Sequence, residues 1–454
     1  MLRTLKMHPR GLAVLFFTEA WERFSFYGMR ALLVLYMTEA LLVPSSTQSV
    51  VGYVALRSIL ENIFGPLSVQ AISSHIYGIY TGLLYVTPFL GGLLADRLLG
   101  QMRTVQIGGV LMALGHFLMA FDTWFFFALT CIIIGNGCFK PNISSQVGDL
   151  YDKGDNRRDS AFSIFYVGIN LGAFIAPVVC GTLGEVYGWH YGFFSAGIGM
   201  LVGLTVFTFG QRYLPQDTRT RSLARRRGSD GLGSMTRPDA RAIAVLCALA
   251  LVLTFFWAGY EQQGNAVVLW VRDFTNRSFF GLFDIKITWF QSVNPLLIFA
   301  LTPPVLMLWA YLASTQREPS PAGKIVLGCF IGGVAYLLLA LAASFGGATA
   351  KVSWVWTVGC FILLTLAELL VSPIALSLFS RVAPLKAVSM MMGVWFMSGA
   401  LGNYFAGVIG SYWERLPKSW FWCGIAMSCF AAGLIVLALK RTIERMIAER
   451  ADPA

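Results

Sequence analysis

Long apolar stretches separated by short polar connections run along the whole chain. Five of these stretches contain no Asp, Glu, Lys or Arg: residues 186–211, 287–316, 325–350, 387–413 and 419–439. A helix of about 20 apolar residues crosses the hydrocarbon core of a bilayer, and it satisfies its backbone hydrogen bonds internally. The pattern therefore predicts an all-α membrane protein.

Twelve transmembrane helices are predicted once the less purely apolar segments are included. The longest polar interruption, residues 212–240, is rich in Arg, Gly and Ser, which is typical of a flexible linker. Six spans on each side of it predict two six-helix bundles, 1–211 and 241–440, and then a cytosolic tail, 441–454; this organisation resembles the major facilitator fold. The expected spans cover about residues 11–38, 73–98, 104–121, 123–147, 160–185, 189–211, 241–270, 287–313, 324–346, 352–379, 386–412 and 418–440.

The distribution of charge gives the orientation in the membrane. Only 13% of the 454 residues are charged, against about 25% in soluble domains, and the formal net charge is +11. With the N-terminus inside, 24 Lys and Arg residues fall in inner segments and 7 in outer ones. The positive-inside rule then predicts that both termini are cytoplasmic. The expected location is the plasma (bacterial inner) membrane. Because topology explains the excess charge, we expect no nucleic-acid partner.

Seven Glu, Lys and Arg residues lie well inside the expected spans, away from their ends, where each charge costs about 3 kcal/mol. In the first span, at about 100° per residue, Glu19, Glu22, Arg23, Phe26, Tyr27 and Arg30 share one face. Glutamates change charge within an accessible pH range and arginines do not, so the glutamates are the candidate proton carriers. The alternative is that these charges only pair to hold helices together. The seven are Glu19, Glu22, Arg23, Arg30, Lys140, Glu261 and Glu368.

Aromatic and amide residues inside the spans are weaker candidates, because packing and interhelical hydrogen bonds also use them. They are Tyr80, Tyr85, Tyr166, Asn170, Trp257, Asn294 and Trp395. The sequence shows no metal-ligand cluster, nucleophile motif or soluble catalytic domain, so we do not expect an enzyme or a bound metal. Between the first two spans, residues 44–72 form an outer connection with a partly amphipathic piece near residues 52–67.

Motifs along nearly the whole chain resemble those of the proton-dependent oligopeptide transporter (POT) family, a branch of the major facilitator superfamily. Glu19-Ala-Trp-Glu22-Arg23-Phe24-Ser-Phe26-Tyr27 is similar to the family's ExxERFxYY motif, with Phe26 where the family usually has a tyrosine. Further matches are Gly91–Arg103 and Phe162–Phe174, the two family signatures, Phe139–Asn142, Phe256–Gln262, Phe290–Pro295 and Glu368–Pro373.

The resemblance implies proton-coupled symport of di- and tripeptides into the cell by alternating access, with the proton as coupling ion and no other cofactor. It implies that Glu19, Glu22 and Arg23 form the proton-coupling cluster, with Lys140 as partner of its carboxylates. Glu261, opposite Arg30, is then a second protonatable site. Arg30 and Lys140 would attract the peptide C-terminus, and Glu368 its amino group. The pocket would be lined by Tyr27, Tyr80, Asn170, Trp257, Asn294, Ser372 and Trp395.

The expected partners are the peptide substrate and the lipid bilayer, and we expect a monomer to be functional. The alternatives within transporters are carriers of an amino acid, nitrate or a drug on the same scaffold. A peptide receptor that binds without transport is an alternative from another class.

Overall fold

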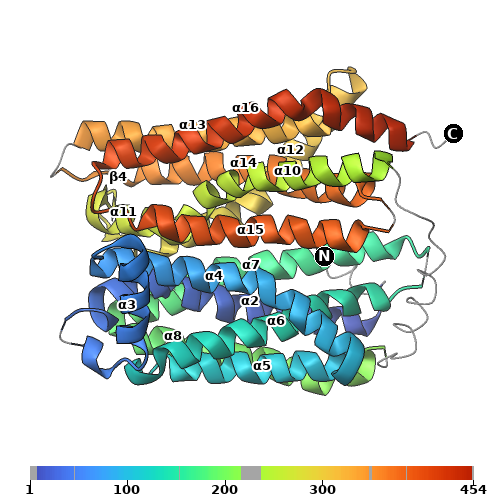
Figure 1. Ribbon diagram of the computed structural model, residues 1–454. Coiled ribbons are helices and arrows are strands. Elements are labelled where there is room, and N and C mark those ends of the chain that lie inside the picture. The colour runs from blue at the N-terminus through green and yellow to red at the C-terminus, as the bar shows by residue number, and fades with distance from the viewer. Residues whose placement is uncertain are drawn as a thin grey trace. The chain divides into compact units, whose positions relative to one another are not determined.

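The structure is a computed structural model that describes residues 8–44, 46–152, 154–215, 237–346, 350–384 and 386–451, and it is mainly helical (Figure 1). Among these residues, ten helical segments are long and apolar enough to cross a membrane. Helices α2 (Arg10–Tyr36) and α5 (Gln101–Leu118) are also at least 18 residues long but fall outside that set. The membrane character of the chain is confirmed, whereas the count of twelve spans stays a prediction.

The helices follow the expected spans closely. In the N-terminal half, α2 is followed by α3 (Tyr53–Phe64), α4 (Val69–Leu94), α5, α6 (Phe125–Asp149), α7 (Arg157–Tyr187) and α8 (Trp189–Gly210). The C-terminal half contains α10 (Arg237–Tyr260), α11 (Ala266–Phe274), α12 (Val293–Ser314), α13 (Pro321–Gly346), α14 (Trp354–Val382), α15 (Val388–Gly410) and α16 (Lys418–Ala451).

Short helical turns and strands complete the described chain. The π-helical turns are η1 (Met37–Leu41) and η3 (Ala95–Leu99), and the 3-10 turns are η2 (Thr47–Ser49), η4 (Asp122–Trp124), η5 (Gln211–Tyr213), η6 (Glu261–Gly264) and η7 (Thr288–Ser292). The strands form two-residue pairs: β1 (Thr275–Asn276) is parallel to β4 (Val352–Ser353), and β2 (Ser278–Phe279) is antiparallel to β3 (Phe283–Asp284).

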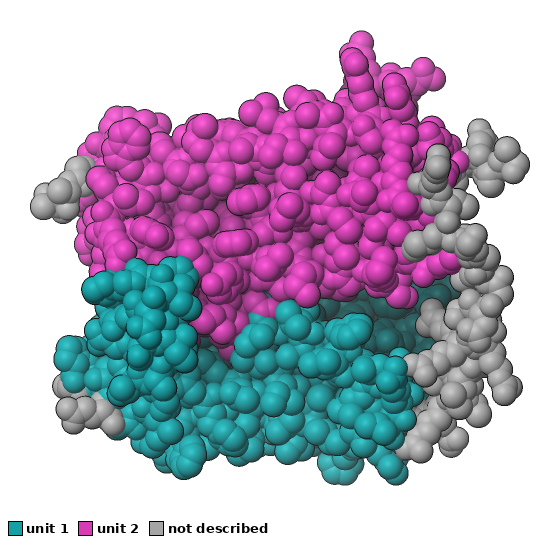
Figure 2. All heavy atoms as spheres, in the orientation of Figure 1, with its two compact units in different colours: residues 1–73, 83–228, 286–295 teal, residues 74–82, 229–285, 296–454 magenta. Residues whose placement is uncertain are grey.

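Two compact units share the helices (Figure 2). Unit 1 comprises residues 1–73, 83–228 and 286–295, and unit 2 comprises residues 74–82, 229–285 and 296–454. In unit 1, α2 packs against α7 and α8 while α5 packs against α6; in unit 2, α13 packs against α14 and α16 while α10 packs against α15. Each half of the chain therefore builds most of one unit, and each unit also takes a short segment from the other half.

The span expected over residues 241–270 is not one helix, so that prediction was wrong in detail. Helix α10 ends at Tyr260, the 3-10 turn η6 follows, and Asn265 has φ −125° and ψ −97° before α11 begins. The turn contains Gly264 and two glutamines, and Gln262 Nε2 donates to the carbonyl oxygen of Ala406 in α15 at 2.9 Å. Such a hydrogen bond outside the helix offsets the backbone bonds that the break gives up.

The outer connection contains the amphipathic piece expected near residues 52–67, as helix α3. Glycines with positive φ flank it, Gly52 at 87° and Gly65 at 76°, a region that residues with a Cβ rarely adopt. On its surface Arg57 Nε donates to Glu61 Oε1 at 3.0 Å.

Close helix contact in unit 1 depends on glycine, which gives a matched test. A Cβ at Gly91 of α4 would lie 1.9 Å from the carbonyl oxygen of Gly137 in α6, whereas a Cβ at Gly92 would meet nothing within 4 Å. We expect Gly91→Ala to lower the free energy of unfolding by about 1 to 3 kcal/mol, as overpacking does, and Gly92→Ala to leave it nearly unchanged. Thermal unfolding in detergent measures both, and equal midpoints would contradict the close approach.

Candidate functional site

A buried ion cluster occupies the middle of α2. Glu19, Glu22 and Arg23 are each less than 5% exposed. Arg23 Nε lies 3.1 Å from Glu19 Oε1, and Arg23 Nη2 donates to Glu22 Oε1 at 2.7 Å. Arg23 Nε also contacts the second oxygen of Glu22. Arg23 therefore contacts both carboxylates, as expected from the position of the three residues on one face of the helix.

The oxygens of Glu19 are not equivalent. Oε1 contacts Arg23, but Oε2 is buried and has no hydrogen-bond partner within the described part of the chain. A buried acceptor without a partner is costly, and binding a proton or a hydrogen-bond donor removes that cost. The cluster thus contains a specific oxygen at which a proton can be accommodated.

Phe26, the departure from the family motif, contacts the same arginine. The Arg23 guanidinium carbon lies 5.0 Å from the centre of the Phe26 ring, and Phe26 meets Tyr27 edge to face with ring centroids 5.1 Å apart. An aromatic face attracts a guanidinium without a hydroxyl group. Phe26 therefore adds an aromatic contact to the cation of the cluster.

Asn136 of α6 joins the cluster, and the sequence analysis missed it. It is 1% exposed, its Nδ2 donates to Glu22 Oε1 at 3.4 Å, and its own Oδ1 has no partner among the described residues. Lys140 follows four residues later on α6, and its Nζ lies 5.3 Å from the centre of the Tyr85 ring. The spacing of Asn136 one turn before Lys140 was a usable signal, because residues four apart share a helix face.

A glycine of the second family signature lets α7 approach this cluster. A Cβ at Gly172 would lie 2.1 Å from the carbonyl oxygen of Ala20 and 2.9 Å from the Cβ of Arg23. Any larger residue would push α7 away from the turn of α2 that holds the charges. The local sequence therefore keeps the cluster packed against backbone.

In unit 2, the carboxylate of Glu368 has a hydrogen-bond partner. Tyr260, the last residue of α10, donates its hydroxyl to Glu368 Oε2 on α14 at 2.6 Å. Tyr260 was not singled out from the sequence, although it precedes Glu261 in a matched motif. Glu261 itself opens the turn η6 and is 4% exposed. Ser372 lies one helical turn after Glu368 on α14 and is partly buried.

Two tryptophans of unit 2 that were predicted to line the pocket contact each other. The rings of Trp257 on α10 and Trp395 on α15 meet edge to face, with centroids 5.9 Å apart. Trp257 also meets Tyr260 at 5.5 Å, and Trp395 meets Phe379 at the same distance. The tryptophans therefore border the Tyr260–Glu368 pair and also belong to the apolar core of this unit.

The remaining predicted residues lie on α2, α4, α7 and α12, and their roles stay predictions. Tyr27 and Arg30 are partly buried on α2. Tyr80 on α4 is 1% exposed. Asn170 Nδ2 donates to the carbonyl oxygen of Tyr166 in its own helix at 3.0 Å, and Asn294 lies partly buried in the first turn of α12.

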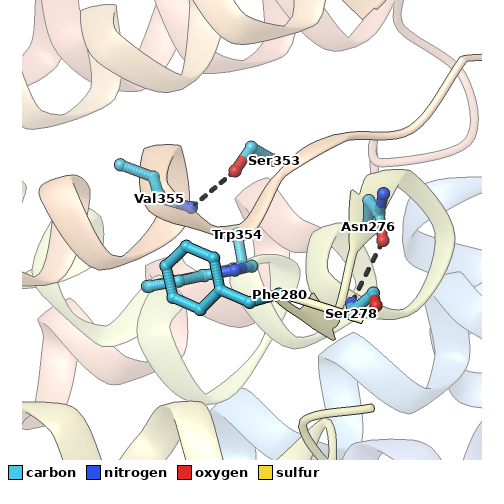
Figure 3. Close-up of a pocket in the computed structure, with 6 residues that line it drawn as sticks. All are labelled: Asn276, Ser278, Phe280, Ser353, Trp354 and Val355. Atoms are coloured by element: carbon cyan, nitrogen blue, oxygen red, sulfur yellow. Dashed lines mark hydrogen bonds between the residues drawn. The ribbon is translucent and has the colours of Figure 1, made fainter. Parts of the chain in front are cut away.

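A pocket of about 260 Å³ lies elsewhere in unit 2, beside β1 and β4 (Figure 3). Its lining contains none of the predicted site residues. Two of its polar side chains already cap turns: Ser353 Oγ accepts from the Val355 amide, and Asn276 Oδ1 accepts from the Ser278 amide. The pocket is lined by Asn276, Ser278, Phe280, Ser353, Trp354 and Val355.

Apolar helices that surround buried, ion-paired carboxylates define an integral membrane transporter, because charges at membrane depth mark ion and substrate pathways. A family model described as the POT family matches residues 102–227 and 234–426. The chain belongs to the POT family.

Similar proteins span almost the same length. The peptide transporter YePEPT of Yersinia enterocolitica is 35% identical over 96% of this chain and 95% of that protein. A di-/tripeptide transporter of Lactococcus lactis subsp. cremoris is 32% identical over 98% of both. The crystal structure of a peptide transporter POT in complex with sulfate has 30% identity and a TM-score of 0.82, covering 97% of this chain and 96% of that one.

The ion cluster predicts how unit 1 responds when its cation is removed. We expect Arg23→Met to destabilise the protein by about 3 kcal/mol, because breaking a buried ion pair leaves uncompensated buried charge. The triple variant Glu19→Gln/Glu22→Gln/Arg23→Met, which has no charge to compensate, recovers most of that loss. Thermal unfolding in detergent compares them, and a single variant as stable as the wild type would refute the shared ion pair.

Proposed function

We propose that the protein carries di- and tripeptides into the cell together with protons, by alternating access. The observation that carries this proposal is the buried cluster in which Arg23 serves both Glu19 and Glu22. In this cluster two carboxylates share the guanidinium of Arg23, and Glu19 keeps a buried oxygen at which a proton can bind. The Yersinia relative is named a peptide transporter and the Lactococcus relative a di-/tripeptide transporter, which supports peptides as the substrate.

Proton binding changes which contacts Arg23 can keep. When a proton neutralises one carboxylate, that carboxylate attracts Arg23 less, and Asn136 is positioned to hydrogen-bond Glu22 in either charge state. A difference in proton affinity between two conformations shifts their populations. Glu19, Glu22 and Arg23 are therefore the proposed coupling residues, and Glu261 at the break between α10 and α11 is a second protonatable site.

Peptide recognition uses the opposite charges of the two termini. In the proposed assignment Arg30 and Lys140 attract the C-terminal carboxylate, and Glu368 receives the amino group. Tyr260 holds Glu368 by a hydrogen bond from a neutral group, which orients the carboxylate without cancelling its charge. The proposed pocket-lining residues are Tyr27, Tyr80, Asn170, Trp257, Asn294, Ser372 and Trp395.

The proposed topology has twelve spans in two bundles, residues 1–211 and 241–440, in the plasma (bacterial inner) membrane with cytoplasmic termini. The proposed linker, 212–240, falls mostly on residues 216–236, which lie outside the described residues. Helix α16 continues to Ala451, so the proposed tail, 441–454, begins as its last turns. The proposed carrier acts as a monomer, without an enzymatic step or a cofactor other than the proton.

Uptake of labelled dialanine into proteoliposomes, with and without an inward proton gradient, tests the proposal. We expect uptake that needs the gradient and is reduced by unlabelled dipeptides but not by peptides with blocked termini. Uptake without a gradient would refute proton coupling. Inhibition by nitrate or drugs in place of peptides would assign another solute, and saturable binding without flux would indicate a receptor.

Glu22 distinguishes proton coupling from peptide binding. We expect Glu22→Gln to abolish gradient-driven uptake and to leave peptide counterflow, because counterflow exchanges peptide without net proton movement. Glu61→Gln on the surface of α3 is the matched control and should leave both activities intact. If Glu22→Gln loses counterflow as well, Glu22 has a binding or folding role.

Tyr260 provides a test of amino-terminal recognition. We expect Tyr260→Phe to raise KM for dialanine at least about tenfold, because a hydrogen bond to a charged group contributes about 1.5 to 3 kcal/mol, with little change in kcat. Tyr336→Phe, which removes a hydroxyl that donates to the Gly259 carbonyl, is the control at a neighbouring site. Equal effects of the two substitutions on KM would contradict a specific role for Tyr260.

A further inference from the structure

Side-chain hydrogen bonds join the break between α10 and α11 to α15 and to the part of α4 that belongs to unit 2. Asn265 Oδ1 accepts from Ser74 Oγ on α4 at 2.9 Å, and Asn265 Nδ2 donates to the carbonyl oxygen of Ala406 on α15 at 3.2 Å. Gln262 Nε2 donates to the same oxygen at 2.9 Å. Ser74, Gln262 and Asn265 are fully buried. Helices α4 and α15 and the break after α10 therefore meet at one buried polar contact.

Glycines make this contact possible. A Cβ at Gly410 would lie 2.1 Å from Asn265 Nδ2, and one at Gly407 would lie 2.6 Å from the carbonyl oxygen of Ser74. A Cβ at Gly78 would lie 2.7 Å from the Cα of Gly407. Glycines at these positions thus allow α4 and α15 to approach each other, and α15 to approach Asn265, more closely than a Cβ would permit.

The hydrogen bonds of Asn265 lie where the helix is interrupted, since this residue has φ −125° and ψ −97°. A buried polar group without a hydrogen-bond partner costs free energy, and loss of Asn265 would take this partner from the buried Ser74 hydroxyl. The turn that carries Asn265 begins with Glu261, the second proposed protonatable group.

We propose that Ser74, Gln262, Asn265 and the Ala406 carbonyl form a latch that closes the outer side of the carrier. The proposal rests on the proposed function and topology, in which α4 begins and α15 ends on the outer side. Residues 74–82 come from the N-terminal half of the chain, whereas Asn265 and Ala406 come from the C-terminal half. Opening the cavity outward parts these helices and requires the latch to release.

Thiol labelling from outside tests the latch. The reporter is Thr81→Cys, a buried position three residues after Gly78, in a background where the two partly exposed cysteines, Cys247 and Cys423, are serine. We expect Asn265→Leu to raise the rate of modification by a membrane-impermeant maleimide at least threefold. Gln263→Leu is the matched control, because Gln263 Nε2 bonds only within its own turn, to the Tyr260 carbonyl, at 3.1 Å.

Two further variants test the latch without relying on the Asn265→Leu substitution alone. Ser74→Ala should give a smaller rise than Asn265→Leu, and it should add nothing to that variant because both remove one shared bond. Gly410→Ala should act like Asn265→Leu, since its Cβ would take the place of Nδ2. Only variants that elute as folded monodisperse protein are compared.

The outcomes separate the latch from the transport activity. A modification rate in Asn265→Leu equal to that in Gln263→Leu would overturn the latch, as would additive effects of Ser74→Ala and Asn265→Leu. Faster labelling in a protein that takes up no peptide would support the latch and refute the proposed substrate, because the labelling does not require transport.

Discussion

The cost of burying charge among apolar helices is the constraint on which the rest of the site depends. Helix α2 places two carboxylates and one guanidinium within little more than one turn. Each of these charges costs about 3 kcal/mol at membrane depth when it has no partner. Contact of Arg23 with both carboxylates and with the face of Phe26 offsets this cost. The arrangement still leaves one buried oxygen of Glu19 without a hydrogen-bond partner among the described residues. The contacts that stabilise the charged helix therefore also leave an oxygen to which, in the proposed mechanism, a proton binds.

Glycine placement decides whether such contacts can form. Gly172 brings the backbone of α7 against α2, and Gly402 brings α15 against α10, where its Cβ would lie 2.4 Å from that of Trp257. In a bilayer, helix association is driven by close packing and hydrogen bonds, since lipid tails are as apolar as the helices. The many glycines inside the spans thus determine which polar side chains meet. A substitution at one of them acts on the site without touching a charged residue.

The sequence predicted the features that depend on local periodicity. The apolar runs located the long helices, and a period of 3.6 residues placed Glu19, Glu22 and Arg23 on one face, where the ion pairs now join them. Asn136 and Tyr260 were missed because their significance lies in partners 114 and 108 residues away. The break at Glu261–Asn265 was missed for the same reason, because a polar run inside an apolar span is also typical of a charged site. The hydrogen bond that offsets the break is accepted by the carbonyl oxygen of Ala406, which lies 144 residues from Gln262.

The carboxylates of the site differ in the kind of partner that fixes them, and this difference separates their roles. Glu22 is held by Arg23, a permanent cation, so its negative charge is already matched by an ion pair. Glu368 accepts a hydrogen bond from the hydroxyl of Tyr260, a neutral donor that narrows the positions the carboxylate can take and does not neutralise its charge. A carboxylate that is not neutralised by a cation attracts an ammonium group more than one already in an ion pair. This difference agrees with the proposed roles, in which the carboxylates of α2 sense protons and Glu368 on α14 binds the amino group.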